Sequence, residues 1–192
     1  TDGTLTIDKA HLTVTADNQS RLYGQANPSL TQTISGFVNN ENLASSGVSG
    51  TALGSTSATA TTNVGSAAIV ASTSGLSAGN YDFTASSTDG TLTIDKAHLT
   101  VTADNKTRLY GQANPTLTTT VSGFVNGESA STAAGFAGAG TASTTAVAAT
   151  NVGTATITAG AGTLAATNYD FANLTDGTLT IDKAHLTVTA DN

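Results

Sequence analysis

An eighteen-residue block, TDGTLTIDKAHLTVTADN, occurs three times without a change, starting at Thr1, Thr88 and Thr175. Successive starts lie 87 residues apart, and a fixed period with identical text is typical of one structural unit copied in tandem. Any chemistry assigned to one unit must then be available in every unit. This arrangement is unusual for an enzyme and natural for a structural array, so the sequence favours repeated structural domains.

Alternation of apolar and polar residues predicts a strand in each half of the block. Apolar side chains occupy odd positions in residues 4–7 and even positions in residues 10–16, and a period of two indicates half-buried strands. Because the phase changes between the halves, one flat strand cannot bury both sets. A domain boundary after Asp8, Asp95 and Asp182 explains the change, and a β-bulge within one long strand is the alternative.

The boundary interpretation divides the chain into two complete β repeat domains, residues 9–95 and 96–182. Residues 1–8 are then the last strand of a preceding repeat, and residues 183–192 are the first strand of a following repeat. The composition is rich in Thr, Ser, Ala and Gly, with only 5% aromatic residues, as suits thin β-domains. We therefore expect a mostly β protein, with small β-sandwich or β-grasp-like domains arranged end to end as an extended rod.

Further landmarks recur within each unit. The segment RLYGQANP at residues 21–28 predicts a core anchor at Tyr23 and a sharp turn at Gly24. The two copies differ most at residues 45–62 and 131–150, which indicates exposed loops or edge strands. Shorter motifs predict further strands at residues 30–34 and 80–83, and at residues 117–121 and 168–171 of the second copy.

Charge and composition exclude several classes of partner. The formal net charge is −7 with six Lys and Arg residues, whereas nucleic acids and anionic membranes require clustered cations. Cysteine is absent, so disulfides and thiol chemistry do not contribute. No apolar run reaches the roughly 20 residues of a membrane span. We therefore predict no nucleic-acid partner and no membrane span in this sequence.

The three histidines, His11, His98 and His185, occupy the same place in successive blocks. Each lies on the strand face opposite a leucine, which predicts a surface or junction position. Serine and aspartate are plentiful, but no nucleophile-elbow motif accompanies the histidines. We therefore assign no catalytic, cofactor-binding or metal-binding residue, and we expect no enzyme activity.

Calcium is the one cofactor that the acidic residues leave open. Oxygen ligands are available in the first unit at Asp8, Asp17, Asn18, Asn80, Asp82 and Asp89. No run resembles an EF-hand or a calcium-binding nonapeptide, and solvated acids that favour solubility are the alternative. A junction site, at which Asp8 and Asp17 face each other, is the form that such binding would take.

Two kinds of modification are weighed against simpler interpretations. Sequons for N-glycosylation begin at Asn18, Asn105 and Asn173, although chance matches are expected in a chain rich in Ser and Thr. Isopeptide bonds are conceivable at Lys9, Lys96 and Lys183. Because each of these lysines follows an aspartate, we expect ordinary ion pairs instead.

The aromatic side chains are predicted to form the small core. Those that recur in register are Tyr23, Phe37, Tyr81 and Phe83, with Tyr110, Phe124, Tyr169 and Phe171 in the second unit. A sugar-stacking platform is the alternative for these residues. Phe136 has no counterpart in the first unit, and we expect it to be an exposed contact.

The ordered set of motifs resembles the MBG-type repeat domains, of the YGX type, in large bacterial surface adhesins. The matching pieces are LTVTADN, RLYGQANPSL, SGFVNxE, the NVG turn, GNYDF or TNYDF, and GTLTIDKA, and they cover essentially the whole chain. The resemblance implies tandem, mostly β domains of very long secreted or cell-surface proteins, with no catalytic residues. It defines no binding partner.

We expect the repeats to be stalk or spacer domains of an extracellular bacterial adhesin that project a distal adhesive region. Neighbouring repeats of the same chain are the predicted partners. The first alternative is a set of low-affinity modules for glycan, mucin or matrix, strengthened by repetition. The second is self-association through exposed edge strands.

Overall fold

The computed structural model describes residues 2–86 and 88–190. Thr1, Asp191 and Asn192, at the ends of the predicted terminal strands, and Ser87 lie outside the described residues. The described residues contain β-strands and no helix, which confirms the prediction of tandem, mostly β units. The chain divides into two units, Thr1–Asp95 (unit 1) and Lys96–Asn192 (unit 2).

Unit 1 contains two small mixed sheets. Their strands are β1 (Ala10–Ala16), β2 (Gln19–Leu22), β3 (Gln32–Ser35), β4 (Gly65–Ile69), β5 (Tyr81–Ala85) and β6 (Gly90–Asp95). One sheet has the order β3-β1-β5 and the other has the order β2-β6-β4. The central strand of each sheet pairs in parallel with one neighbour, β1 with β5 and β6 with β2. It pairs antiparallel with the other neighbour, β1 with β3 and β6 with β4.

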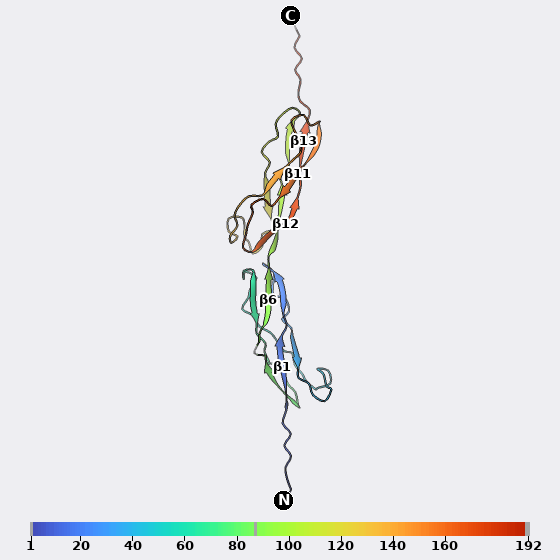
Figure 1. Cartoon of the computed structure of the whole chain (residues 1–192), viewed down its shortest axis with the longest axis vertical. Helices are drawn as coiled ribbons and strands as arrows, with labels where there is room; N and C mark the ends of the chain where they lie inside the picture. The colour runs from blue at the N-terminus through green and yellow to red at the C-terminus, as the bar shows by residue number, and fades with distance from the viewer. Residues whose placement is uncertain (1, 87, 191–192) are drawn as a thin grey trace. The chain divides into compact units, whose positions relative to one another are not determined.

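Unit 2 repeats this arrangement. Its strands are β7 (Ala97–Ala103), β8 (Lys106–Leu109), β9 (Thr119–Ser122), β10 (Thr141–Ser143), β11 (Gly153–Gly160), β12 (Tyr169–Thr175) and β13 (Gly177–Asp182). The sheets have the orders β12-β7-β9 and β10-β11-β13-β8, and Figure 1 shows β11 beside β13. The counterpart of β10 in unit 1 is a single bridge between Ser55 and Val70. The two segments predicted to vary, residues 45–62 and 131–150, therefore form loops and short pairings at the edge of a sheet.

Short connections carry the chain from one sheet of a unit to the other. Only two residues separate β1 from β2, and the side-chain oxygen of Asn18 in this connection accepts a hydrogen bond from the Thr91 amide of β6 at 2.8 Å. A Cβ atom at Gly90 would lie 2.6 Å from the carbonyl oxygen of Ala16. Glycine is required there because the two backbones approach so closely.

Alternating side chains of the central strands form the core of each unit. In unit 1, Leu12, Val14, Leu92 and Ile94 are fully buried, while the threonines between them face outward or are only partly covered. In unit 2, the corresponding fully buried residues are Leu99, Val101, Leu179 and Ile181. Burying one such side chain contributes about 1.5–3 kcal/mol, so period-two alternation supplies the main stabilisation of each unit.

The first half of the first copy of the block and the second half of the third copy form no strand in the described residues. Residues 2–9 and 183–190 have no sheet partner among the described residues, and Figure 1 shows both as extended chain. Leu5 and Ile7 are 85% and 86% exposed, and Leu186 and Val188 are 92% and 95% exposed. These two segments are unpaired here, and a strand needs a neighbour for its backbone hydrogen bonds. Their assignment to strands of a preceding and a following repeat stays a prediction.

Candidate functional site

The RLYGQANP segment forms a buried hydrogen-bond network around an arginine, which we call the Arg–Asn network. Arg21 is 6% exposed, and its Nε–H donates to Asn27 Oδ1 at 2.8 Å. Its terminal amino groups donate to the carbonyl oxygens of Leu22 at 3.1 Å and Thr59 at 2.5 Å. Asn27 in turn donates to the carbonyl oxygen of Ala58 at 2.7 Å. The network thus fastens the long variable loop to β2.

Unit 2 contains the same network with a different loop sequence. Arg108 is 5% exposed and donates to Asn114 Oδ1 at 2.8 Å and to the carbonyl oxygen of Val147 at 2.6 Å. Asn114 donates to the carbonyl oxygen of Ala146 at 2.6 Å. Because the acceptors in the loop are backbone carbonyls, the loop can change sequence without losing these hydrogen bonds.

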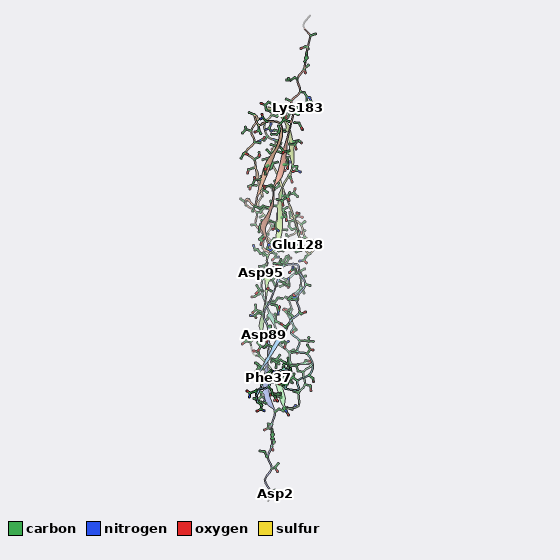
Figure 2. The ribbon with its side chains drawn as sticks, turned by 90° about the vertical axis from the view of Figure 1, so that its right-hand side faces the viewer. Asp2, Phe37, Asp89, Asp95, Glu128 and Lys183 are labelled. Atoms are coloured by element: carbon green, nitrogen blue, oxygen red, sulfur yellow. The ribbon has the colours of Figure 1, made fainter. Side chains whose placement is uncertain are left out.

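A tyrosine–glutamate hydrogen bond fixes a second loop in each unit. The Tyr81 hydroxyl donates to Glu41 Oε2 at 2.5 Å and accepts from the Val38 amide at 3.3 Å. The hydrogen bond to Glu41, together with burial, raises the pKa of Tyr81. The Tyr169 hydroxyl makes the same bond to Glu128, which is labelled in Figure 2. This contact explains why SGFVNxE and NYDF recur together.

Histidine and aspartate stand directly opposite each other on the parallel strands β1 and β5. His11 Nδ1 lies 2.5 Å from Asp82 Oδ1, and in unit 2 His98 Nδ1 lies 2.8 Å from Asp170 Oδ1. The His11 and His98 side chains are 77% and 48% exposed. Both histidines therefore lie at the surface, as predicted, but the pairing with aspartate was missed. The recurrence of the histidine and of the NYDF motif in each unit, 71 and 72 residues apart, was the available signal.

A groove beside this pair occurs at the same place in both units, and we call it the Lys–Phe groove. In unit 1 it has a volume of about 330 Å³, and its lining includes Lys9, Leu76, Ser77, Tyr81, Asp82 and Phe83. In unit 2 its volume is about 520 Å³, and the corresponding residues are Lys96, Leu164, Ala165, Tyr169, Asp170 and Phe171. The groove combines an ammonium group, a carboxylate and an aromatic ring.

The lysines make backbone contacts at the rim of this groove. Lys9 Nζ donates to the carbonyl oxygen of Ala78 at 2.9 Å, and Lys96 Nζ donates to that of Ala166 at 3.0 Å. Among the described residues, both side chains thus donate to carbonyl oxygens and not to the neighbouring aspartates. Lys183 follows β13, in the segment that forms no strand.

The oxygens considered for calcium are distributed over different parts of unit 1. Asp17 accepts a hydrogen bond from the Thr33 hydroxyl at 2.7 Å, Asn18 holds the start of β6, and Asp82 pairs with His11. Within residues 2–86 and 88–190, no three His, Cys, Asp or Glu side chains gather as a metal site would require. Calcium binding at a junction stays a prediction.

The predicted sequons lie at exposed positions. Asn18, Asn105 and Asn173 are all exposed. The side-chain oxygen of Asn105 accepts a hydrogen bond from the Thr178 amide at 2.7 Å, as Asn18 does in unit 1. Asn173 lies in β12 opposite Thr100. Glycosylation of these residues also stays a prediction.

The recurring aromatic residues are buried tyrosines and half-buried phenylalanines, and Tyr110 and Phe136 differ from the prediction. Tyr81 and Tyr169 are fully buried. Tyr110 is 43% exposed, whereas Tyr23 at the corresponding position of unit 1 is 3% exposed. Phe136 is half-buried and not an exposed contact: its ring centroid lies 5.5 Å from that of Phe124 and 6.0 Å from that of Phe171.

Comparison with known proteins gives one family. The family model described as MBG domain (YGX type) matches residues 12–93 and 99–180, one copy in each unit. No curated protein and no solved structure matches the chain. The described part of the chain contains no helix with the length and apolar character needed to cross a membrane. Since the family model matches most of the chain, this protein belongs to the MBG domain family of the YGX type, with two of its domains in tandem.

Proposed function

We propose that the two units are spacer domains in the stalk of a secreted or cell-surface bacterial adhesin, and that they project a distal adhesive region. The observation that carries this proposal is the repetition of a complete domain. Each unit has its own pair of sheets, its own core and its own Arg–Asn network. Units of this kind add length to an array, since the stability of such an array is approximately a sum over repeats and their interfaces.

The pattern of variation supports a spacer role. Residues of the central strands and the hydrogen-bonding side chains recur, whereas the long loops at residues 45–62 and 131–150 differ. A spacer requires only that each unit folds. Repeats of this family are of a non-catalytic type and are typically found in extracellular surface proteins, which supports the proposed location and the absence of a catalytic role.

Adhesion by cells that display the parent protein tests the proposal. The array is replaced by an unrelated β-domain array of equal length, and a second variant deletes it. We expect the replacement to retain adhesion and the deletion to reduce it, because length is the contribution of a spacer. Loss of adhesion in the equal-length replacement would refute the spacer role and favour direct binding by the repeats.

A further inference from the structure

Each unit contains a tight turn that ends at the glutamate bonded to the buried tyrosine. In unit 2 the turn spans residues 125–128, and the Glu128 amide donates to the carbonyl oxygen of Val125 at 3.0 Å. Its two central residues, Asn126 and Gly127, have φ values of 55° and 71°. A four-residue turn with this hydrogen bond and positive φ at both central residues is of type I′.

Unit 1 forms the same turn at residues 38–41. The Glu41 amide donates to the carbonyl oxygen of Val38 at 3.0 Å. The central residues are Asn39 and Asn40, with φ values of 55° and 59°. The two turns therefore share their backbone form and their first, second and fourth residues. They differ only at the third residue, which is asparagine in unit 1 and glycine in unit 2.

An asparagine followed by glycine is a reactive pair, and residues 126–127 are the one Asn-Gly pair in the sequence. The backbone nitrogen of the glycine attacks the side-chain carbonyl carbon, Cγ, and the new N–Cγ bond closes a five-membered succinimide ring. The bond from Cγ to the side-chain nitrogen breaks, and ammonia leaves with the proton lost by the attacking amide. Water then opens the ring at either carbonyl and yields aspartate or isoaspartate. The reaction consumes one water and needs no oxidant or cofactor.

The turn of unit 2 holds the asparagine in the backbone region that ring closure requires. Cγ and the attacking nitrogen must lie on the same side of the Cα–C bond, which needs a ψ of about −120°, as at the first central residue of a type II′ turn. That position also has positive φ, and Asn126 already has a φ of 55°. A flip of the peptide plane between Asn126 and Gly127 therefore converts type I′ to type II′ and brings the nitrogen against Cγ.

The attacking nitrogen is accessible in unit 2. Asn126 and Gly127 are both exposed, and the Gly127 amide makes no hydrogen bond to any of the described residues. A Cβ atom at Gly127 would meet nothing within 4 Å, so neighbouring groups leave the peptide plane room to flip. In unit 1 the attacking nitrogen belongs to Asn40, whose side chain crowds the approach and restricts the backbone.

We propose that Asn126 is a site of spontaneous modification, at which the folded turn closes a succinimide and opens it to aspartate or isoaspartate. The co-reactant is water. The modification is selective for unit 2, because the matching turn of unit 1 has no glycine at its third position. This site goes beyond the spacer role and does not depend on it, so the adhesion experiment and the experiments below can fail separately.

The modification acts on the contact that fixes the second loop of unit 2. The Tyr169 hydroxyl donates to Glu128 Oε2 at 2.5 Å and accepts from the Val125 amide at 3.1 Å. Both partners flank the Asn-Gly pair. Isoaspartate lengthens the backbone between them by one methylene group, so the hydroxyl can no longer hold both in their present positions. Unit 2 is therefore destabilised by the reaction, and unit 1 is not.

The first test follows the full 192-residue chain during incubation at mildly alkaline pH. Peptide mass spectrometry measures the conversion of each asparagine to the heavier aspartate or isoaspartate. The Asp-Gly pairs at residues 89–90 and 176–177 do not interfere, because isomerisation of aspartate leaves the mass unchanged. We expect Asn126 to convert faster than Asn39. No conversion at Asn126, or equal rates at the two residues, would overturn the proposal.

A peptide of residues 122–131 separates the effect of the fold from that of the sequence. We expect conversion of Asn126 both in the peptide and in the folded chain. Conversion in the peptide alone would show that the folded turn blocks the flip of the peptide plane, and the proposal would be wrong.

Two reciprocal variants test the role of the third turn residue. Gly127→Asn gives unit 2 the turn sequence of unit 1 and should slow conversion of Asn126 about tenfold or more. Asn40→Gly gives unit 1 the reactive pair and should raise the rate at Asn39 to that of Asn126. Each variant introduces a residue that the other unit already accommodates with positive φ, so both should fold. An unchanged rate in either variant would contradict the assigned cause.

Thermal unfolding of the incubated chain tests the consequence. Amide signals of Leu179 report on unit 2 and those of Leu92 on unit 1, since both residues are fully buried. We expect a lower Tm for unit 2 after conversion of Asn126 and an unchanged Tm for unit 1. The Gly127→Asn chain, incubated in the same way, should keep both values. An unchanged Tm of unit 2 after full conversion would refute the effect on the Tyr169 contact.

Discussion

Replacing Arg21 with methionine should destabilise unit 1 and leave unit 2 folded. Methionine retains an unbranched apolar chain but removes every donor of the guanidinium. Asn27 Oδ1 and the carbonyl oxygens of Leu22 and Thr59 then lose their hydrogen bonds. Arg21 is only 6% exposed, so water has limited access to these acceptors, and the loss is not fully compensated.

The expected magnitude follows from the three lost hydrogen bonds. A net value of about 1 kcal/mol for each bond gives a loss of about 3 kcal/mol in the free energy of unfolding. Hydrogen bonds from charged donors are usually worth more than this. We use the lower value because replacing Arg21 also removes the cost of keeping a charge at a buried position, which offsets part of the loss. For a domain of this size, 1 kcal/mol corresponds to about 4–8 °C in Tm, so the expected fall is about 12–24 °C.

The assay is thermal unfolding followed by amide NMR signals of each unit. Leu92 reports on unit 1 and Leu179 on unit 2, since both are fully buried strand residues. Arg108→Met should produce the reverse result. Lys183→Met removes a positive charge from an exposed position and should change the free energy of unfolding by less than about 0.5 kcal/mol.

Two further variants separate the hydrogen-bond network from simple loss of charge. Arg21→Lys keeps the charge without the planar geometry of the guanidinium, so it should recover only part of the stability. In a double-mutant cycle, Arg21→Met and Asn27→Ala should be strongly non-additive. Additive effects, or a loss below about 1 kcal/mol for Arg21→Met, would refute our account of the network.

The remaining predictions concern single contacts. The hydrogen bond to Glu41 and burial raise the pKa of Tyr81, so folding favours the protonated hydroxyl. The resulting stability is present below the ordinary tyrosine pKa of about 10. It is lost as the pH rises through the higher pKa of the folded state. Tyr81→Phe should therefore reduce this alkaline sensitivity in a pH series of unfolding curves. The Thr118 and Thr120 hydroxyls lower the pKa of Asp104, and Thr118→Val should raise that pKa in an NMR titration; an unchanged value would contradict the assigned cause. The stability from this shift is present above the ordinary aspartate pKa and is lost as pH falls through the folded-state pKa. Gly177→Ala should destabilise unit 2 in calorimetry, because its Cβ would collide with a backbone carbonyl of β7, and a wild-type Tm would show that the strands can separate without cost.

Much of the fold could be predicted from local patterns. Period-two alternation identified the central strands, and the fixed period identified the tandem units. Glycine identified turns where the backbone has positive φ, as at Gly24 and Gly111, with φ values of 83° and 86°. These features depend on neighbouring residues and on the allowed backbone angles, which a sequence displays directly.

The side-chain contacts of the candidate site could not be predicted in the same way. His11 and Asp82 are 71 residues apart in sequence, and the parallel pairing of β1 with β5 brings them together. The Arg–Asn network also depends on a loop carbonyl 38 residues from Arg21. Pairing over such distances is decided by how the sheets assemble, and alternation within a strand carries no information about its partner.

Copies of the identical block separate what the sequence determines from what the tertiary structure determines. Leu5 and Leu92 occupy the same position in the block, yet Leu5 is 85% exposed and Leu92 is fully buried. Leu186 is likewise 92% exposed, whereas Leu12 and Leu99 are buried. The sequence by itself determined the repeat, the strand-forming pattern and the face that each side chain takes. Only the tertiary structure decided which copies became strands, because backbone hydrogen bonds and apolar burial both require a partner strand and an opposing core.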